Sequence, residues 1–142
     1  MNEKREAFLA GERLGDVHVY IADDAVSNVD ALETHGERVD GGVVLVIDGE
    51  RARDVFQRTA GIDPMQLAGQ AMETEGEVDP DCTGGTCPAG DGPEHEPRFI
   101  FAFAQAQNED VGGLYAEGDV IHAYVACSCG EYYSEKWVAQ QR

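Results

Sequence analysis

The run Val43-Val44-Leu45-Val46-Ile47 decides the fold that this sequence predicts. Four of its five residues are β-branched, and no polar residue interrupts it. A continuous run of this kind is typical of a strand covered on both faces, since a strand with one wet face alternates apolar and polar residues. Gly41-Gly42 before the run and Asp48-Gly49 after it mark its ends. We therefore predict a central buried strand over residues 43–47.

The segments on either side of this strand supply its first neighbours. Residues 17–21 alternate apolar and polar side chains, which predicts a strand with one face on the core. A helix is expected to start at Ser27 and to end before Gly36. A strand, a helix and a buried strand in this order predict a βαβ unit with a right-handed crossover. Residues 52–59 then carry apolar side chains at helical spacing, which predicts an amphipathic helix.

The next helix has the clearest local signal. Asp63 is a suitable N-cap, and Pro64 fits the first helical position because no hydrogen-bonded N–H is needed there. Met65 and Met72 lie on the side of this helix that we expect to pack in the core. Nearer the end of the chain, Ser134 is expected to cap a last helical turn.

The second half of the sheet is predicted from two apolar segments. Residues 99–104 alternate phenylalanine with isoleucine or alanine, which predicts a strand with one aromatic and one aliphatic face. Residues 120–126 predict the next strand, and we expect the two to form an antiparallel hairpin. The predicted fold is a single α/β domain over residues 1–142. Its mixed sheet of four or five strands, a βαβ unit plus the hairpin, is covered by helices and carries a cysteine-clamped loop.

The charge of the chain limits its partners. There are 28 acidic residues against 10 basic ones, a formal net charge of -18, and Lys4 and Lys136 are the only lysines. Non-specific binding to nucleic acid or anionic lipid is therefore not expected, because both depend on basic groups. Acidic residues spread along a chain with few lysines are typical of adaptation to molar salt. The N-terminus is too polar for a signal peptide and the apolar runs are too short to cross a bilayer, so we expect a cytoplasmic protein.

Residues 76–97 form an acidic loop of unusual composition. This loop holds four of the five prolines, five of the seventeen glycines and six acids, with no lysine or arginine. A stretch of 22 residues without regular structure inside a compact domain is usually functional or disordered. A ligand that fixes the loop to the rest of the domain is the functional explanation that we favour.

All four cysteines of the chain point to such a ligand. Cys82 and Cys87 lie in the acidic loop, and Cys127 and Cys129 follow the strand predicted over residues 120–126. Four thiolates at tetrahedral corners are a common structural zinc site. Residues two apart in an extended segment point to the same face, and the glycines between the first two cysteines allow the chain to turn back. We predict that these four cysteines bind structural zinc.

The cysteine spacing leaves alternatives open. The spacings are C-x4-C and C-x-C rather than the usual C-x2-C, so a disulfide between the two pairs, an iron–sulfur cluster or four free thiols are also consistent with the sequence. A reducing cytoplasm favours metal over a disulfide. His95 lies in the same loop and is an alternative ligand.

Four runs of the sequence are distinctive beyond their predicted structure. They are Val39-Asp40-Gly41-Gly42-Val43-Val44-Leu45-Val46, Gly61-Ile62-Asp63-Pro64-Met65, Cys82-Thr83-Gly84-Gly85-Thr86-Cys87 and Gly112-Gly113-Leu114-Tyr115-Ala116-Glu117-Gly118-Asp119. These runs resemble a family of small haloarchaeal proteins of unknown function. The resemblance implies a salt-loving archaeal cytosol, but it implies no activity and no site residues.

The sequence favours a binding protein over an enzyme. It has no phosphate-binding or dinucleotide-binding glycine motif, no H-E-x-x-H and no G-x-S-x-G. His122 and Cys127 are five residues apart and should face opposite sides of a strand, so we predict no catalytic residues. We predict a non-catalytic zinc-binding module that meets an unknown protein partner. A thiol redox switch using the same four cysteines, or association with a ribosome or another nucleoprotein, are the alternatives.

Overall fold

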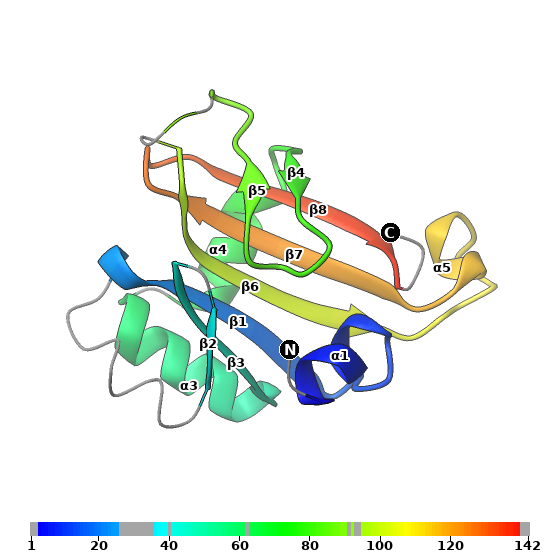
Figure 1. Ribbon diagram of the computed structural model, residues 1–142. Helices are drawn as coiled ribbons and strands as arrows, with labels where there is room; N and C mark the ends of the chain where they lie inside the picture. Colours follow the sequence, from blue (N-terminus) through cyan, green and yellow to red (C-terminus); the bar gives the residue numbers. More distant parts are fainter. Residues whose placement is uncertain are drawn as a thin grey trace.

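The computed structural model describes residues 3–25, 36–39, 41–61, 63–90, 92 and 95–139. Its main element is a six-stranded antiparallel sheet (Figure 1). The strands are β1 (Asp16–Ala22), β2 (Glu37–Val39), β3 (Gly42–Asp48), β6 (Pro97–Gln105), β7 (Val120–Cys127) and β8 (Tyr132–Val138). They lie in the order β2-β3-β1-β6-β7-β8, so β1 is inside the sheet although it comes first in the chain. Two short strands, β4 (Glu77–Val78) and β5 (Gly85–Thr86), form a separate hairpin within the acidic loop.

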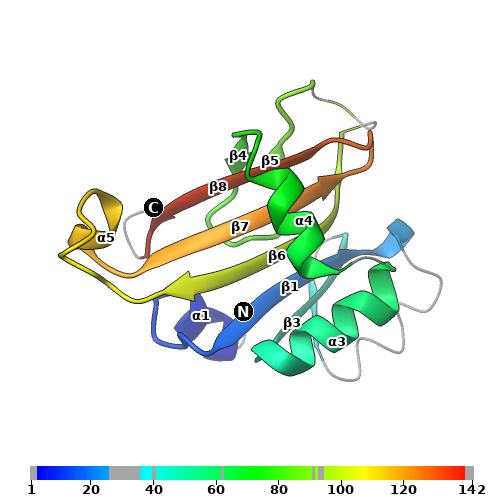
Figure 2. The ribbon, with the colours of Figure 1, turned by 180° about the vertical axis from the view of Figure 1, so that it is seen from behind.

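Helices cover the two faces of the sheet from different parts of the chain. They are α1 (Glu3–Leu9), α3 (Gly49–Ala60), α4 (Pro64–Ala71) and α5 (Leu114–Glu117), with a 3-10 turn η1 (Asp23–Ala25). Helices α3 and α4 lie on one face, whereas α1 and the β4–β5 hairpin lie on the other (Figures 1 and 2). None of the helices in the described ranges is both long enough and apolar enough to cross a membrane.

The sheet is larger than predicted and has no βαβ unit. Strands β1 and β3 are neighbours and run antiparallel, with Val19 opposite Leu45. The prediction of a right-handed crossover between them is therefore wrong, and so is the count of four or five strands. The apolar pattern identifies both strands but carries no information about their direction, and the three-residue β2 is too short to recognise from sequence. The helix predicted from Ser27 lies outside the described residues.

Both faces of the central strands are buried. Residues 43–46 of β3 are buried without interruption, as the apolar run predicts, and Ile47 at its end is partly buried. Phe101 of β6 lies opposite Tyr124 of β7 in the predicted hairpin. Strand β1 is buried from Val17 to Ile21, including His18, so the prediction that only one of its faces meets the core is wrong. The reason is that β1 lies between β3 and β6 with a layer on each side.

Two separate cores result, one on each face. On the α3 and α4 face, Phe56 packs edge-on against Phe99 and Phe101, with ring centroids 5.6 and 5.4 Å away. Full burial of a side chain of this size contributes roughly 2–3 kcal/mol. On the α1 face, Phe8 belongs to the same cluster as Ile100, in agreement with an aromatic and an aliphatic face on β6.

Local signals place α4, but they do not decide which of its sides is buried. The Asp63 carboxylate accepts a hydrogen bond from the Met65 N–H at 2.8 Å, and Pro64 is the first helical residue, as predicted. Met65 and Met72 are 68% and 66% exposed, however, so their predicted place in the core is wrong. The buried side of the helix is instead formed by Leu67 and its neighbours.

The last predicted helical turn is a strand. Residues 134–138 belong to β8, which pairs with β7 along its whole length. Tyr133 and Trp137 are both buried in the α1-side core. Side chains four residues apart share a face in a helix and also in a strand, so the sequence pattern here fits both structures.

Candidate metal centre

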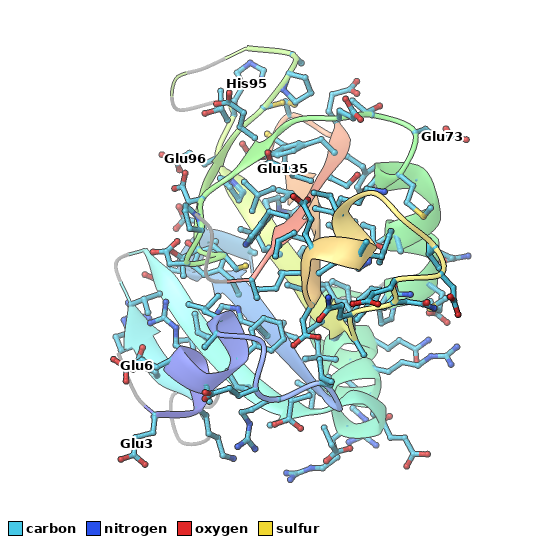
Figure 3. The ribbon with its side chains drawn as sticks, turned by 90° about the vertical axis from the view of Figure 1, so that its right-hand side faces the viewer. Glu3, Glu6, Glu73, His95, Glu96 and Glu135 are labelled. Carbon is cyan, nitrogen blue, oxygen red and sulfur yellow. The ribbon has the colours of Figure 1, made fainter. Side chains whose placement is uncertain are left out.

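Two turns meet at one end of the sheet and bring the candidate ligands together. Cys87 follows β5 and His95 precedes β6, while Cys127 ends β7 and Cys129 lies in the turn to β8. Figure 1 shows the β5–β6 connection beside the β7–β8 turn, and Figure 3 shows His95 at the end of the molecule remote from α1. The two turns are joined directly by the backbone of Glu96 and by Ser128.

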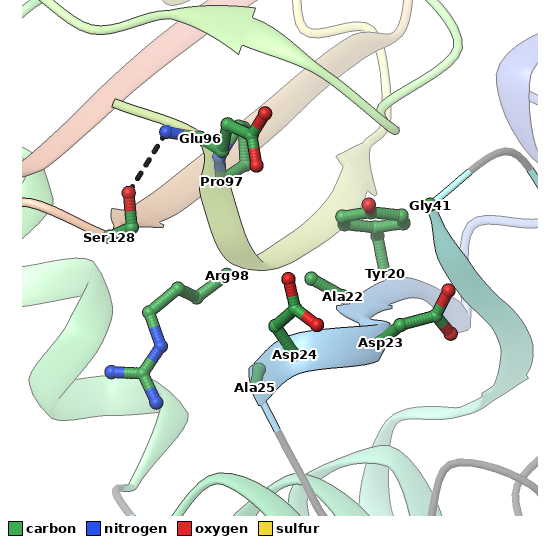
Figure 4. A pocket seen from close by; sticks show the side chains of 10 residues that line it. All are labelled: Tyr20, Ala22, Asp23, Asp24, Ala25, Gly41, Glu96, Pro97, Arg98 and Ser128. Carbon is green, nitrogen blue, oxygen red and sulfur yellow. Dashed lines mark hydrogen bonds between the residues drawn. The ribbon is translucent and has the colours of Figure 1, made fainter. Parts of the chain in front are cut away.

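Two reciprocal hydrogen bonds hold these turns. The Ser128 N–H donates to the Glu96 carbonyl oxygen at 2.8 Å, and the Glu96 N–H donates to Ser128 Oγ at 3.0 Å (Figure 4). Because each residue stands next to candidate ligands in the chain, this pair fixes the spacing of the two turns. The ligand side chains are therefore positioned by backbone contacts that do not themselves involve sulfur.

The geometry of the four side chains fits a tetrahedral metal. The ligand atoms of Cys87, His95, Cys127 and Cys129 all lie within 4.8 Å of one another. The Sγ atoms of Cys87 and Cys129 are 3.8 Å apart. A tetrahedral site with zinc–sulfur bonds of about 2.3 Å has sulfur–sulfur edges of about 3.8 Å. The other pairs would therefore have to approach by no more than about 1 Å around such an ion.

The β7–β8 turn directs backbone N–H groups at sulfur. The Cys127 N–H donates to the Glu131 carbonyl oxygen at 2.9 Å, and Gly130 adopts a φ of 96°, which favours glycine. In this turn the Cys129 N–H donates to the sulfur of Cys127, and the Glu131 N–H donates to the sulfur of Cys129. Such donors stabilise thiolates in metal sites.

Burial and hydrogen bonding act differently on the two thiols of this turn. Burial raises the pKa of the Cys127 thiol to about 11. The hydrogen bond from the Glu131 N–H lowers the pKa of the exposed Cys129 thiol below its ordinary value. A bound cation would replace the proton on the buried sulfur, so metal binding here must release protons and must weaken as the pH falls.

His95 completes the set with a ring nitrogen that needs a partner. Its Nδ1 is buried and has no hydrogen-bond partner among the described residues. A methyl group added at Gly90 would come within 2.9 Å of Nε2, so the ring is packed closely against that glycine. Buried polar atoms nearly always have a partner, and coordination to a metal would supply one to this imidazole.

Cys82, the fourth cysteine of the predicted site, lies elsewhere. It is fully buried in the α1-side core and has a positive φ of 59°. Its N–H donates to the Asp79 carbonyl oxygen at 2.9 Å, which closes the turn of the β4–β5 hairpin and directs the side chain inward. Burial raises the pKa of the Cys82 thiol, so it stays neutral. The structure thus brings three of the predicted cysteines together with His95, and none of the four cysteines is in a disulfide.

Sequence reasoning gave His95 too little weight because ligand pairs close in sequence were expected to act together. A five-residue spacing with two glycines between Cys82 and Cys87 looks like a ligand turn, but here it is a hairpin turn that separates the two side chains. The available signal was a lone histidine in the cysteine-bearing loop.

A cleft borders this centre. It has a volume of about 720 Å³ and is lined by Tyr20, Ala22, Asp23, Asp24, Ala25, Gly41, Glu96, Pro97, Arg98 and Ser128 (Figure 4). Asp23 is engaged by Arg38 at 2.7 Å. The cleft shares Glu96 and Ser128 with the hydrogen-bonded contact between the two turns, so it lies beside the candidate centre.

Neither His18 nor His122 forms a nucleophile pair with a cysteine. His122 stacks on Phe103 with centroids 4.9 Å apart, and its Nε2 lies 3.1 Å from Gln105 Oε1. It is therefore on the α3 and α4 face, whereas Cys127 belongs to the α1-side core, in agreement with the predicted opposite faces. His18 is buried, and its Nε2 accepts a hydrogen bond from Arg5 Nε at 3.4 Å.

Comparison with known proteins gives a family but no activity. A family model described as a family of unknown function, DUF5807, matches residues 36–140. No curated protein and no solved structure matches the chain.

Proposed function

The chain belongs to the DUF5807 family of unknown function, and we propose that it is a structural zinc-binding module. The observation that carries this proposal is the placement of four ligand atoms, from Cys87, His95, Cys127 and Cys129, within 4.8 Å of one another. Three thiolates and one imidazole are a common ligand set for structural zinc, and they suit it better than they suit calcium or magnesium, which prefer oxygen. Zinc is also the metal that the sequence suggested, but His95 replaces Cys82 in the ligand set.

A structural role is supported by the completeness of the ligand set. Four protein ligands fill a tetrahedral zinc and leave no position for water or substrate, unlike the three-ligand sites of zinc enzymes. The metal would fasten the segment between β5 and β6 to the β7–β8 turn. That segment is otherwise held to the turn through Glu96 and Ser128. Structural zinc can contribute on the order of 10 kcal/mol of apparent folding free energy, far more than two hydrogen bonds.

Metal analysis combined with a thiol count tests the proposal. Protein purified under reducing conditions should contain about one zinc per chain, and a chelator should expose the thiols of Cys87, Cys127 and Cys129 to a thiol reagent. Cys87→Ser should lose the metal. Parent protein that folds stably without metal, with Cys129 reacting at once and unaffected by added zinc, would refute the proposal.

A thiol redox switch is the second candidate function. Cys129 is exposed, and its sulfur is 3.8 Å from that of Cys87, close enough to form a disulfide after a small movement. With a peroxide as oxidant, the Cys129 thiolate would take one oxygen to give a sulfenic acid, and the peroxide would leave as water or alcohol. The Cys87 thiol would then displace water to form the disulfide, and the metal would be released. Zinc that stays bound through peroxide treatment at neutral pH would exclude this switch.

We also propose a non-catalytic, protein-binding role in a salt-rich cytoplasm. The net charge of -18 supports the habitat, and Glu3, Glu6 and Glu73 point outward into solvent (Figure 3). Met65 on α4 and Met72 at its C-cap are large apolar side chains left exposed, which supports contact with a protein partner. Capture of a partner by the parent but not by the double variant Met65→Glu and Met72→Glu tests this role. Capture of ribosomes instead would favour the nucleoprotein alternative.

A further inference from the structure

Tyr133 carries a buried hydroxyl that has nothing to bond with among the described residues. Its side chain is the largest of those that are fully buried, and its Oη has no hydrogen-bond partner there. Burying a hydroxyl without a partner costs free energy, and buried tyrosine hydroxyls usually find one. The position of this hydroxyl therefore needs an explanation that the packing of the ring alone does not give.

The β4–β5 hairpin holds the tyrosine ring in one place. A methyl group added at Gly76 would collide with the ring, and one added at Gly85 would lie 2.8 Å from Oη. Gly85 stands two residues before Cys87, so the hydroxyl lies where the chain enters the candidate metal centre. Cys87, Cys127 and Tyr133 also belong to the same buried cluster.

Three cysteines and one aspartate lie near enough to Tyr133 for their charges to act on its hydroxyl. After burial, the largest causes that raise the pKa of Tyr133 are the charges of Cys127 and Cys87, followed by those of Asp79 and Cys129. Three of these four residues are proposed metal ligands. A tyrosine hydroxyl is a hydrogen-bond donor at neutral pH, and the nearby sulfurs would become anionic acceptors when they bind a metal.

We propose that Tyr133 is a positioning residue of the metal centre, and that its hydroxyl donates a hydrogen bond to the coordinated thiolate of Cys127 or Cys87. This inference rests on the proposed metal centre and extends it to the next layer of residues. Coordination keeps sulfur anionic and hence a good acceptor. Three thiolates and a divalent ion leave one net negative charge, and a donor beside the sulfur would spread that charge.

The bond would also connect the metal to the body of the domain. Tyr133 is in β8, whereas Cys87 reaches the site from the hairpin that packs on the tyrosine ring. One side chain would thus connect the metal, the hairpin and the edge of the sheet. No other described residue has both a fully buried side chain and an unpartnered hydroxyl.

Tyr133→Phe tests the inference, with Tyr132→Phe as the matched control. Tyr132 is the neighbouring tyrosine on the other face of β8 and packs in the α3 and α4 core. Zinc affinity is measured by competition with a chromophoric chelator at fixed pH, and the cobalt-loaded proteins are compared by their sulfur-to-cobalt charge-transfer band. Tyr133→Phe should weaken zinc binding about 10- to 100-fold and shift the band to lower energy, because an outer donor is lost. Tyr132→Phe should match the parent within about twofold.

Unfolding in the presence of a chelator tests whether the Tyr133 hydroxyl donates its hydrogen bond to a metal-bound sulfur. Without metal, Tyr133→Phe should be at least as stable as the parent, because the parent then keeps an unpaired hydroxyl. A variant that loses the same stability with and without metal would show that the hydroxyl bonds to a group other than a metal-bound sulfur, and this would overturn the inference. Unchanged zinc affinity together with an unchanged cobalt band would overturn it as well.

The parent protein separates this inference from the proposed function. Failure of the parent to bind zinc or cobalt would refute the metal centre and, with it, the proposed role of Tyr133. Normal metal binding by the parent and equal binding by Tyr133→Phe refutes only the role of Tyr133.

Discussion

Replacing His95 with alanine is the sharpest test of which four residues form the metal centre. The imidazole supplies one of four ligand atoms that lie within 4.8 Å of one another. Structural zinc is held with roughly 10–16 kcal/mol, so an even share per ligand is about 2.5–4 kcal/mol. At about 1.4 kcal/mol per tenfold change, the zinc affinity of His95→Ala should fall roughly 100- to 1,000-fold.

Cys82→Ala is the control for this experiment. It removes a fully buried sulfur that lies outside the ligand group, so it should cost on the order of 1 kcal/mol of folding stability and leave zinc affinity unchanged. Affinity is measured by chelator competition, and stability by urea unfolding with the chelator in excess. The reverse pattern, in which Cys82→Ala loses zinc and His95→Ala keeps it, would restore the four-cysteine site and refute the site described above.

Three further predictions concern stability. Burial and the charge of Arg5 lower the pKa of His18 from 6.5 to about 3, so the unfolded chain takes up a proton that the folded chain refuses. Stability should therefore be complete above about pH 6.5 and should fall by up to about 5 kcal/mol as the pH drops toward 3. Urea unfolding over this range with chelator present measures the loss, and His18→Gln should reduce it. Phe56→Ala should cost about 3–5 kcal/mol in urea unfolding at neutral pH, because the ring is fully buried against Phe99 and Phe101, and a loss below 1 kcal/mol would contradict this packing. Raising KCl from about 0.1 to 2 M should increase the melting temperature, since a net charge of -18 repels itself less when screened, and a lower melting temperature in salt would count against a halophilic habitat.

The sequence was informative wherever one local interaction determines structure. The continuous run of β3 and the alternation in β6 reported their burial correctly, and Asp63 with Pro64 marked the start of α4. Strand direction was not predictable, because an apolar run looks the same whether its neighbour is parallel or antiparallel. Which side of α4 faces the sheet was also not predictable, because both of its sides carry apolar residues and only the tertiary contact chooses Leu67 over Met65.

The sequence predicted a metal site built on cysteines, but it did not predict which four residues form the site. Cys127 and Cys129 are two residues apart at the end of a strand, so local geometry alone places them together. The positions of the other two ligands, Cys87 and His95, depend on how the acidic loop folds. A two-residue pairing between β4 and β5 turns Cys82 into the core and sends Cys87 toward His95, and nothing in the spacing of these residues specifies that pairing.

The position of β1 between β3 and β6 has a consequence for how the protein is made. Val17 pairs with Ile47 on one side and with Phe103 on the other. During translation the first of these pairings can form early, but the second must wait until more than fifty further residues have emerged. Until then, the edge of β1 that later pairs with β6 has unpaired backbone groups that can pair with another chain. Nascent copies on one messenger are therefore the most vulnerable to misassembly.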